Sequence, residues 1–237
     1  MIDSAQSYAS AQDALTKQYQ AITQNLANAS TVGYKRIQCE VQGGGSGGGK
    51  AGSGTVTGKL SLDLTQGHLV QTGRALDLAL NGSGFFVLET PKGNLYTRHG
   101  VFQANAQGQL VDSSGRTVAG ESGPLMFPNG ASESLNVGTD GRIFSGKQEL
   151  GKLRIVEFEK PPDMEPAGQC TYQVRGKANP AAAAKTTVQQ GFQEASNVNM
   201  VDELVGLITV SRLYEANAKS VHSQDDRYKN LLQVAMG

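Results

Sequence analysis

Both ends of the chain carry the periodicity of a long amphipathic helix, whereas short apolar runs and glycines fill the middle. Near the N-terminus the stripe steps by threes and fours through Ala5, Tyr8, Gln12, Leu15, Tyr19, Ile22 and Leu26. Near the C-terminus a similar stripe passes through Val201, Leu204, Ile208, Ser211, Tyr214, Ala218, Val221, Asp225, Tyr228, Leu232 and Ala235. This spacing places each set on one helix face. Because a long helix is unstable alone, each stripe needs a partner.

Local signals set the helix ends. The first helix is predicted from about Asp3 or Ser4, which can cap it, to about Ala29, after which poor helix formers lead to Gly33. The second is predicted to begin near Met200, with Asn199 as its cap and Asp202 in the position of a capping box. No proline interrupts it before Val234. We therefore expect either one long C-terminal helix or two stacked segments.

A glycine-rich run follows the first helix. Residues 43–54 read GGGSGGGKAGSG, a composition with almost no side chains to bury and maximal backbone entropy to lose. It predicts a flexible linker over residues 37–54 that spans on the order of 20 Å as a random coil. So regular a run is also typical of an engineered replacement for a natural loop.

Residues 55–193 have the pattern of an all-β body. Apolar runs of a few residues alternate with glycine turns, as in FFVLETPKGN and LYTRHG. The predicted fold class is α+β, with a meander or barrel-like β body and terminal helices that pair as a coiled-coil-like inner domain. The predicted segments are a helix in 1–36, the linker 37–54, the β body 55–193 and a helix in 194–237. An alternative is that each helix packs its stripe on the β body of its own chain.

Charge and composition disfavour several functions. Equal numbers of acidic and basic residues give a net charge of zero, so no long-range field attracts nucleic acid or an anionic membrane. No run approaches the roughly 20 apolar residues of a membrane span, and the first residues lack a secretory signal pattern. The two cysteines, Cys39 and Cys170, match no metal or redox spacing and are expected as free thiols, with a disulfide as the alternative.

Motifs that suggest catalysis are incomplete. Gly44–Lys50 matches the glycine and lysine positions of a phosphate-binding loop, but Ala51 follows where the loop needs a hydroxyl. His68, His99 and His222 have no local metal-binding partner, and the nucleophile-elbow pattern GxSxG is missing. We expect no catalytic residue, no cofactor, no metal and no enzymatic activity.

Three separated segments resemble one protein family. Residues 24–35, QNLANASTVGYK, resemble the N-terminal signature of bacterial flagellar axial proteins, the rod and hook family, which is NNLAN, a short turn and G-[FY]-[KR]. Gln24 and Val32 depart from that pattern, where Asn and Pro are usual. Residues 194–217 are similar to the C-terminal signature, and residues 72–102, with GFF and YTR, are similar to the central β segment. Within the family the proximal rod proteins look most similar, with the distal rod proteins close behind.

The resemblance implies a structural subunit of the flagellar basal body rod. Terminal helices of many copies would form the inner layer of a tube that transmits torque, with neighbouring rod or hook proteins and the flagellar export apparatus as partners. The predicted assembly interface consists of Leu15, Tyr19, Ile22, Asn25, Leu26, Asn28, Val201, Leu204, Ile208, Tyr214, Val221 and Leu232. The alternative is a non-flagellar binding or adhesion module whose helices only dimerise.

Overall fold

The protein forms two compact units, and each is discontinuous in sequence. The computed structural model describes residues 2–43, 56–91, 93–127, 135–158, 164–176 and 180–236. Unit 1 consists of Met1–Ala27, Ile37–Ser61 and Asn199–Gly237. Unit 2 consists of Asn28–Arg36 and Leu62–Val198. The chain therefore enters unit 2 briefly after its first helix, returns to unit 1, and crosses back for the β strands.

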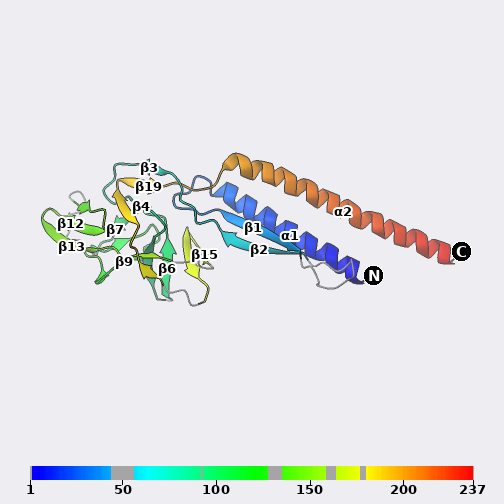
Figure 1. Ribbon diagram of the computed structural model, residues 1–237, viewed down its shortest axis with the longest axis horizontal. Helices are drawn as coiled ribbons and strands as arrows, with labels where there is room; N and C mark the ends of the chain where they lie inside the picture. The colour runs from blue at the N-terminus through cyan, green and yellow to red at the C-terminus, as the bar shows by residue number, and fades with distance from the viewer. Residues whose placement is uncertain are drawn as a thin grey trace. The chain divides into compact units, whose positions relative to one another are not determined.

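Unit 1 contains both helices. The first, α1, spans Ile2–Ala27, and the second, α2, spans Met200–Met236 without a break (Figure 1). The predicted positions of both helices are thus confirmed, and the C-terminal one is a single element. The Asn199 side chain caps α2, because its Oδ1 accepts a hydrogen bond from the Val201 amide at 3.1 Å.

A two-stranded sheet completes unit 1. Strand β1, Ile37–Gly43, pairs with β2, Val56–Leu62. The first seven positions assigned to a linker are therefore β strand, while residues 44–54 of that linker lie outside the described residues. The sheet packs on α1 at Gly58, where an added Cβ would lie 3.4 Å from the Ala14 Cα. This contact accounts for the deep burial of Ala14, which is 2% exposed.

Unit 2 is built from short strands, as predicted. Its main sheet has the order β15-β16-β6-β5-β9-β8-β7, with β10 beside β9, β14 beside β5, and β17 beside β14. These strands are β5 (Phe85–Thr90), β6 (Gly93–Thr97), β7 (Gln103–Ala104), β8 (Leu110–Val111), β9 (Thr117–Gly120), β10 (Gly123–Pro124), β14 (Ile155–Glu157), β15 (Met164–Gly168), β16 (Thr171–Val174) and β17 (Ala181–Ala182). The hairpin of β5 and β6 runs from Phe86 opposite Thr97 to Thr90 opposite Gly93.

Three smaller sheets accompany it. Strands β11 (Leu135–Val137), β12 (Arg142–Ser145) and β13 (Gln148–Lys152) form an antiparallel set. Strand β4 (Leu78–Asn81) pairs with β18 (Thr187–Gln190), and β3 (Leu69–Gln71) pairs with β19 (Phe192–Glu194). The last pairing brings the strand that precedes α2 next to the first strand of the main body of unit 2.

The expectation of a barrel-like body is wrong. In the described residues the main sheet is open, and its end strands β15 and β7 do not pair. The physical reason lies in β5, which is buried on both faces. Phe86 and Leu88 belong to one hydrophobic cluster, whereas Phe85 and Val87 belong to another. A barrel has a single interior, so a sheet that separates two cores has no reason to close.

Candidate functional site

Helices α1 and α2 contact each other along one face of α2. An added Cβ at Gly206 would lie 3.3 Å from the Cδ1 of Ile22, so the small residue lets the two helices approach. Farther along, Asn217 donates a hydrogen bond from Nδ2 to the Gln12 Oε1 at 2.9 Å. Val210 lies on the same face as Gly206 and is buried. This pairing buries a narrow stripe of α2 and leaves the opposite side open.

The opposite side of α2 is an exposed apolar ridge. We define the ridge as Val201, Leu204, Val205 and Ile208, which share one face because they are three, four and seven residues apart. Their exposed fractions are 66%, 45%, 59% and 56%. Three of these residues belong to the predicted interface, and the structure brings them together. The predicted stripe of α2 therefore points away from α1 at its N-terminal end.

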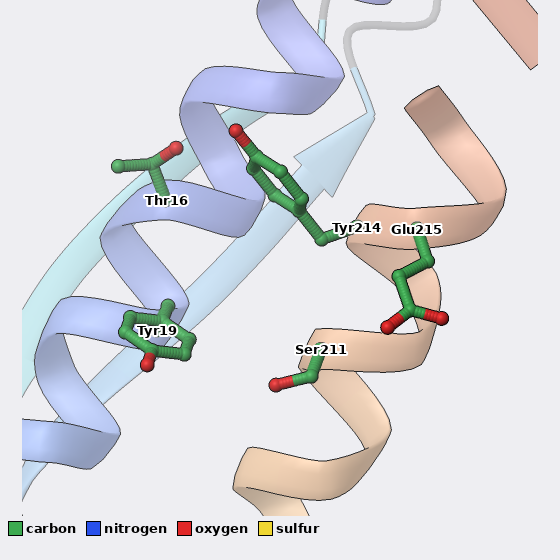
Figure 2. A pocket seen from close by; sticks show the side chains of 5 residues that line it. All are labelled: Thr16, Tyr19, Ser211, Tyr214 and Glu215. Carbon is green, nitrogen blue, oxygen red and sulfur yellow. The ribbon is translucent and has the colours of Figure 1, made fainter. Parts of the chain in front are cut away.

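A groove lies between the two helices, beyond the ridge. Thr16 and Tyr19 of α1 line it together with Ser211, Tyr214 and Glu215 of α2, around a volume of about 430 Å³. Figure 2 shows Tyr214 reaching from α2 toward α1. Tyr19 and Tyr214 both belong to the predicted interface, and each is 45% exposed. Ridge and groove together give unit 1 an apolar surface that its own side chains leave open.

The remaining predicted interface residues differ in their burial. Leu15 and Leu26 are half-buried, Val221 is exposed, and the side chain of Leu232 lies outside the described part of the chain. Ile22 is buried against α2. Asn25 is fully buried and forms paired hydrogen bonds of 2.8 Å with the amide and the carbonyl of Ile37. Asn25 thus fixes the chain from α1 to β1 within its own subunit.

Asn28 also has a role within the chain. Its carbonyl accepts a hydrogen bond from the Thr31 amide at 3.0 Å, and its Oδ1 accepts one from the Thr31 hydroxyl at 3.3 Å. These bonds form the turn that ends the first helical region. Asn28 belongs to unit 2 and is half-buried. These bonds engage its carbonyl and its Oδ1 within the chain, and its place in an assembly interface stays a prediction.

Unit 2 contains a buried ion cluster that the sequence analysis did not predict. Glu194, at the end of β19, lies between two cations, and all three side chains are at most 1% exposed. Its Oε1 accepts a hydrogen bond from the Lys35 Nζ at 2.7 Å, and its Oε2 accepts one from the Arg98 Nη1 at 3.1 Å. The Gly67 amide donates a third bond to Oε1 at 3.0 Å. The carboxylate is therefore well paired despite its burial.

Each cation has further partners. Lys35 donates a second hydrogen bond from Nζ to the Thr65 carbonyl at 2.6 Å. Arg98 donates from Nη2 to the Gly82 carbonyl at 2.6 Å, and its guanidinium lies 4.9 Å from the centre of the Phe85 ring. Burial lowers the pKa of both cations, and attraction to Glu194 offsets part of that effect. Arg98 is thus held by strands of the body, whereas Lys35 comes from the segment after α1.

The three predicted family segments converge at this cluster. Lys35 lies in the N-terminal signature, Arg98 in the central β segment and Glu194 at the start of the C-terminal signature. Lys35 is the one charged residue of the first segment, but the other two segments contain several charged residues, so charge alone did not single out Arg98 or Glu194. Spacing along the chain could not indicate that residues so far apart meet, because the contact depends on the tertiary fold.

The described residues offer no metal site and no membrane span. No group of three His, Cys, Asp or Glu side chains among them could hold a metal ion. Neither helix, over its described residues, is long and apolar enough to cross a membrane. Cys39 and Cys170 are both free thiols, as predicted.

Comparisons with known proteins give matches over most of the chain. The family model described as flagellar basal body rod FlgEFG protein C-terminal matches residues 189–234, and the model described as flagellar hook protein FlgE/F/G D1 domain matches residues 79–145. The flagellar basal-body rod protein FlgG of Buchnera aphidicola (subsp. Acyrthosiphon pisum) is 32% identical, over 90% of this chain and 92% of its own length.

Proteins named FlgF match to nearly the same degree. The flagellar basal-body rod protein FlgF of Mesorhizobium japonicum is 31% identical over 98% of both chains. The FlgF of Caulobacter vibrioides is 31% identical over 89% of this chain and 88% of its own. The similarity therefore extends through both units and is shared between the two kinds of rod protein.

Proposed function

Because the chain belongs to the family of flagellar basal-body rod proteins, we propose that it polymerises through its terminal helices as a structural subunit of the rod. Copies of the chain and neighbouring rod or hook proteins are the proposed partners. The tube they form would transmit torque across the basal body. Delivery by the flagellar export apparatus, without a cleaved signal, is part of the same proposal and rests on the family alone.

The observation that carries the proposal is the exposed ridge of α2. Full burial of one Val, Leu or Ile side chain stabilises a protein by about 1.5–3 kcal/mol. Since the four ridge side chains are roughly half exposed, covering them would contribute about 1 kcal/mol each. A contiguous apolar face of this kind is typical of an interaction surface. It lies opposite the face that α2 uses for α1, so a second helix can pack there without displacing α1.

Ridge and groove suggest how copies would assemble. They occupy different positions along the helix pair, since the ridge ends at Ile208 and the groove begins at Ser211 on α2. A contact between unlike surfaces of identical subunits is heterologous, and a heterologous contact that does not close builds an open helical filament. We propose coiled-coil-like packing of α2 against helices of other copies, with the predicted interface refined to the ridge and the two groove tyrosines.

Ridge variants test this function. Leu204→Asp and Ile208→Asp each place a charge on the ridge, and both are expected to abolish polymer formation, measured by sedimentation and electron microscopy. Helical circular dichroism should remain, because neither side chain is buried in the monomer. Ser220→Asp is the matched control, since it adds the same charge to an exposed site on the flank of α2.

The outcomes separate the candidate functions. Polymers formed by both ridge variants, at the concentration at which the unmodified chain assembles, would show that the ridge is not the interface. A closed dimer of the unmodified chain that never elongates would favour the alternative, a binding module with dimerising helices. Truncation of Ile22 is a poorer test, because that side chain is buried against Gly206 within the subunit.

A further inference from the structure

Two short segments connect unit 2 to the helices, and both are docked within unit 2. We call residues 28–36, which follow α1, the N-lead, and residues 194–198, which precede α2, the C-lead. They lie side by side. The Gly33 amide donates to the Glu194 carbonyl at 2.7 Å, and the Arg36 amide donates to the Asn197 Oδ1 at 2.8 Å. Each lead therefore satisfies backbone groups of the other.

We propose that Glu194 is a latch that makes the docking of the two leads mutually dependent, so that neither detaches from unit 2 without the other. The latch is a conformational device, and it goes beyond the polymerisation assigned above. Its members are Lys35 on the N-lead, Glu194 on the C-lead and Arg98, the residue that directly follows β6. The coupling follows from which of these charges can move and which cannot.

Arg98 is the fixed member. It follows β6, bonds the Gly82 carbonyl and stacks on Phe85, which belongs to a core cluster. Lys35, by contrast, lies on the N-lead, and Glu194 is the last residue of β19, where the C-lead leaves the strand. If the N-lead undocks, Glu194 loses one of its two counter-charges and remains buried. If the C-lead undocks, Lys35 and Arg98 remain as two buried cations without an anion between them. Either state carries the penalty of an unbalanced buried charge.

The neutral groups around the latch reinforce the same coupling. Asn197 of the C-lead donates from Nδ2 to the carbonyls of Asp63 and Thr65, at 2.9 and 3.1 Å. Lys35 of the N-lead also bonds the Thr65 carbonyl. Both leads therefore share one acceptor in the segment that follows β2. Detachment of either lead therefore removes a hydrogen-bond donor from the Thr65 carbonyl.

Hydrogen exchange of backbone amides in the full chain tests the proposal. Lys35→Met removes the charge of the N-lead and keeps a long apolar stem. The decisive amide is Ala195 in the C-lead, which donates to the His68 carbonyl at 2.9 Å and has no bond to Lys35. Its exchange should accelerate on the order of a hundredfold, the factor that corresponds to breaking a buried ion pair.

The reciprocal variant is Glu194→Gln, which keeps the shape of the side chain. The decisive amide is then that of Lys35 in the N-lead, which donates to the Tyr172 hydroxyl in the body of unit 2 and to neither Glu194 nor the C-lead. It should exchange faster by a similar factor. Arg142→Met is the control, because it removes an exposed ion pair with Asp140 and should change neither lead.

The location of the faster exchange decides the result. Acceleration confined to the lead that carries the substitution would overturn the latch, and so would unchanged exchange in both leads. Amides of the β5 and β6 hairpin must stay protected, which shows that unit 2 has not unfolded as a whole. If Lys35→Met does unfold it, Lys35→Arg and Glu194→Asp retain the charges, alter the geometry and carry the same comparison of the two leads.

Discussion

Gly33 offers a sharp test of how closely the N-lead approaches the body of unit 2. Its φ of +67° lies in the left-handed region, and an added Cβ would lie 2.4 Å from the His99 amide nitrogen and 2.6 Å from the Arg98 carbonyl carbon. Both neighbours are main-chain atoms, so no side-chain rotation can relieve the overlap. Gly73 is a matched control, because its φ is +73° and an added Cβ would meet nothing within 4 Å.

The difference between the two alanine variants isolates the steric contact. A left-handed alanine costs about 1–2 kcal/mol, and the loss of freedom in the unfolded chain returns about 0.4–1 kcal/mol. Gly73→Ala should therefore lower the free energy of unfolding by about 1 kcal/mol. Gly33→Ala adds an overlap that typically costs about 1–3 kcal/mol, for a total of about 2–4 kcal/mol.

Urea unfolding measures this difference. The chain contains seven tyrosines and no tryptophan, so near-ultraviolet circular dichroism of tyrosine is the natural signal. Tyr34, Tyr96 and Tyr172 are buried in unit 2 and report on its packing. Equal losses of stability in Gly33→Ala and Gly73→Ala would refute the reasoning, because the close approach of the N-lead to His99 would then have no energetic effect.

Three further substitutions or reactions probe other contacts. Asn25→Ala leaves the amide and the carbonyl of Ile37 without their partner and should destabilise unit 1 by about 2–4 kcal/mol, seen as a lower midpoint of helical circular dichroism; an unchanged midpoint would contradict this. Tyr172→Phe removes the acceptor of the Lys35 amide and should reduce the stability of unit 2 by about 1–3 kcal/mol in urea, whereas no loss would show that water replaces the hydroxyl. Burial raises the pKa of Cys170 to about 11, so its alkylation by iodoacetamide below pH 9 should be about a hundredfold slower than that of a fully exposed thiol, and mass spectrometry showing equal rates would exclude the shift.

Sequence periodicity predicted the elements better than it predicted their partners. Both helices were found because their apolar spacing extends over many turns, and the Asn199 cap was found because capping is local. The second partner of α1, the sheet of β1 and β2, was not predicted. Ala14 packs on the sheet of β1 and β2, and Asn25 bonds Ile37, the first residue of β1. Small or polar residues such as these give no hydrophobic stripe in the sequence. The sheet itself was not predicted, because the glycine-rich run after Gly43 made all of residues 37–54 resemble a linker.

The predicted assembly interface stays a prediction for a related reason. A stripe of period 3.6 shows that a face is apolar but not which neighbour covers it. In α2 the face toward α1 includes Gly206 and Val210, while Leu204 and Ile208 point the other way. The ion cluster of Lys35, Arg98 and Glu194 could not be predicted from the sequence at all. Lys35 and Glu194 are 159 residues apart in the sequence, and no local rule relates residues at that separation.

A backbone hydrogen bond between Arg36 and Asp63 joins the two ends of the segment Ile37–Ser61, which belongs to unit 1. The Asp63 amide donates to the Arg36 carbonyl at 2.8 Å, so the departure point and the return point are neighbours. Lengthening this segment adds little to the entropic cost of loop closure, about 0.6 kcal/mol for each doubling of its length. An epitope or fluorescent tag grafted between Gly43 and Val56 should therefore leave the fold of unit 2 intact, which makes this position a practical handle for labelling the protein.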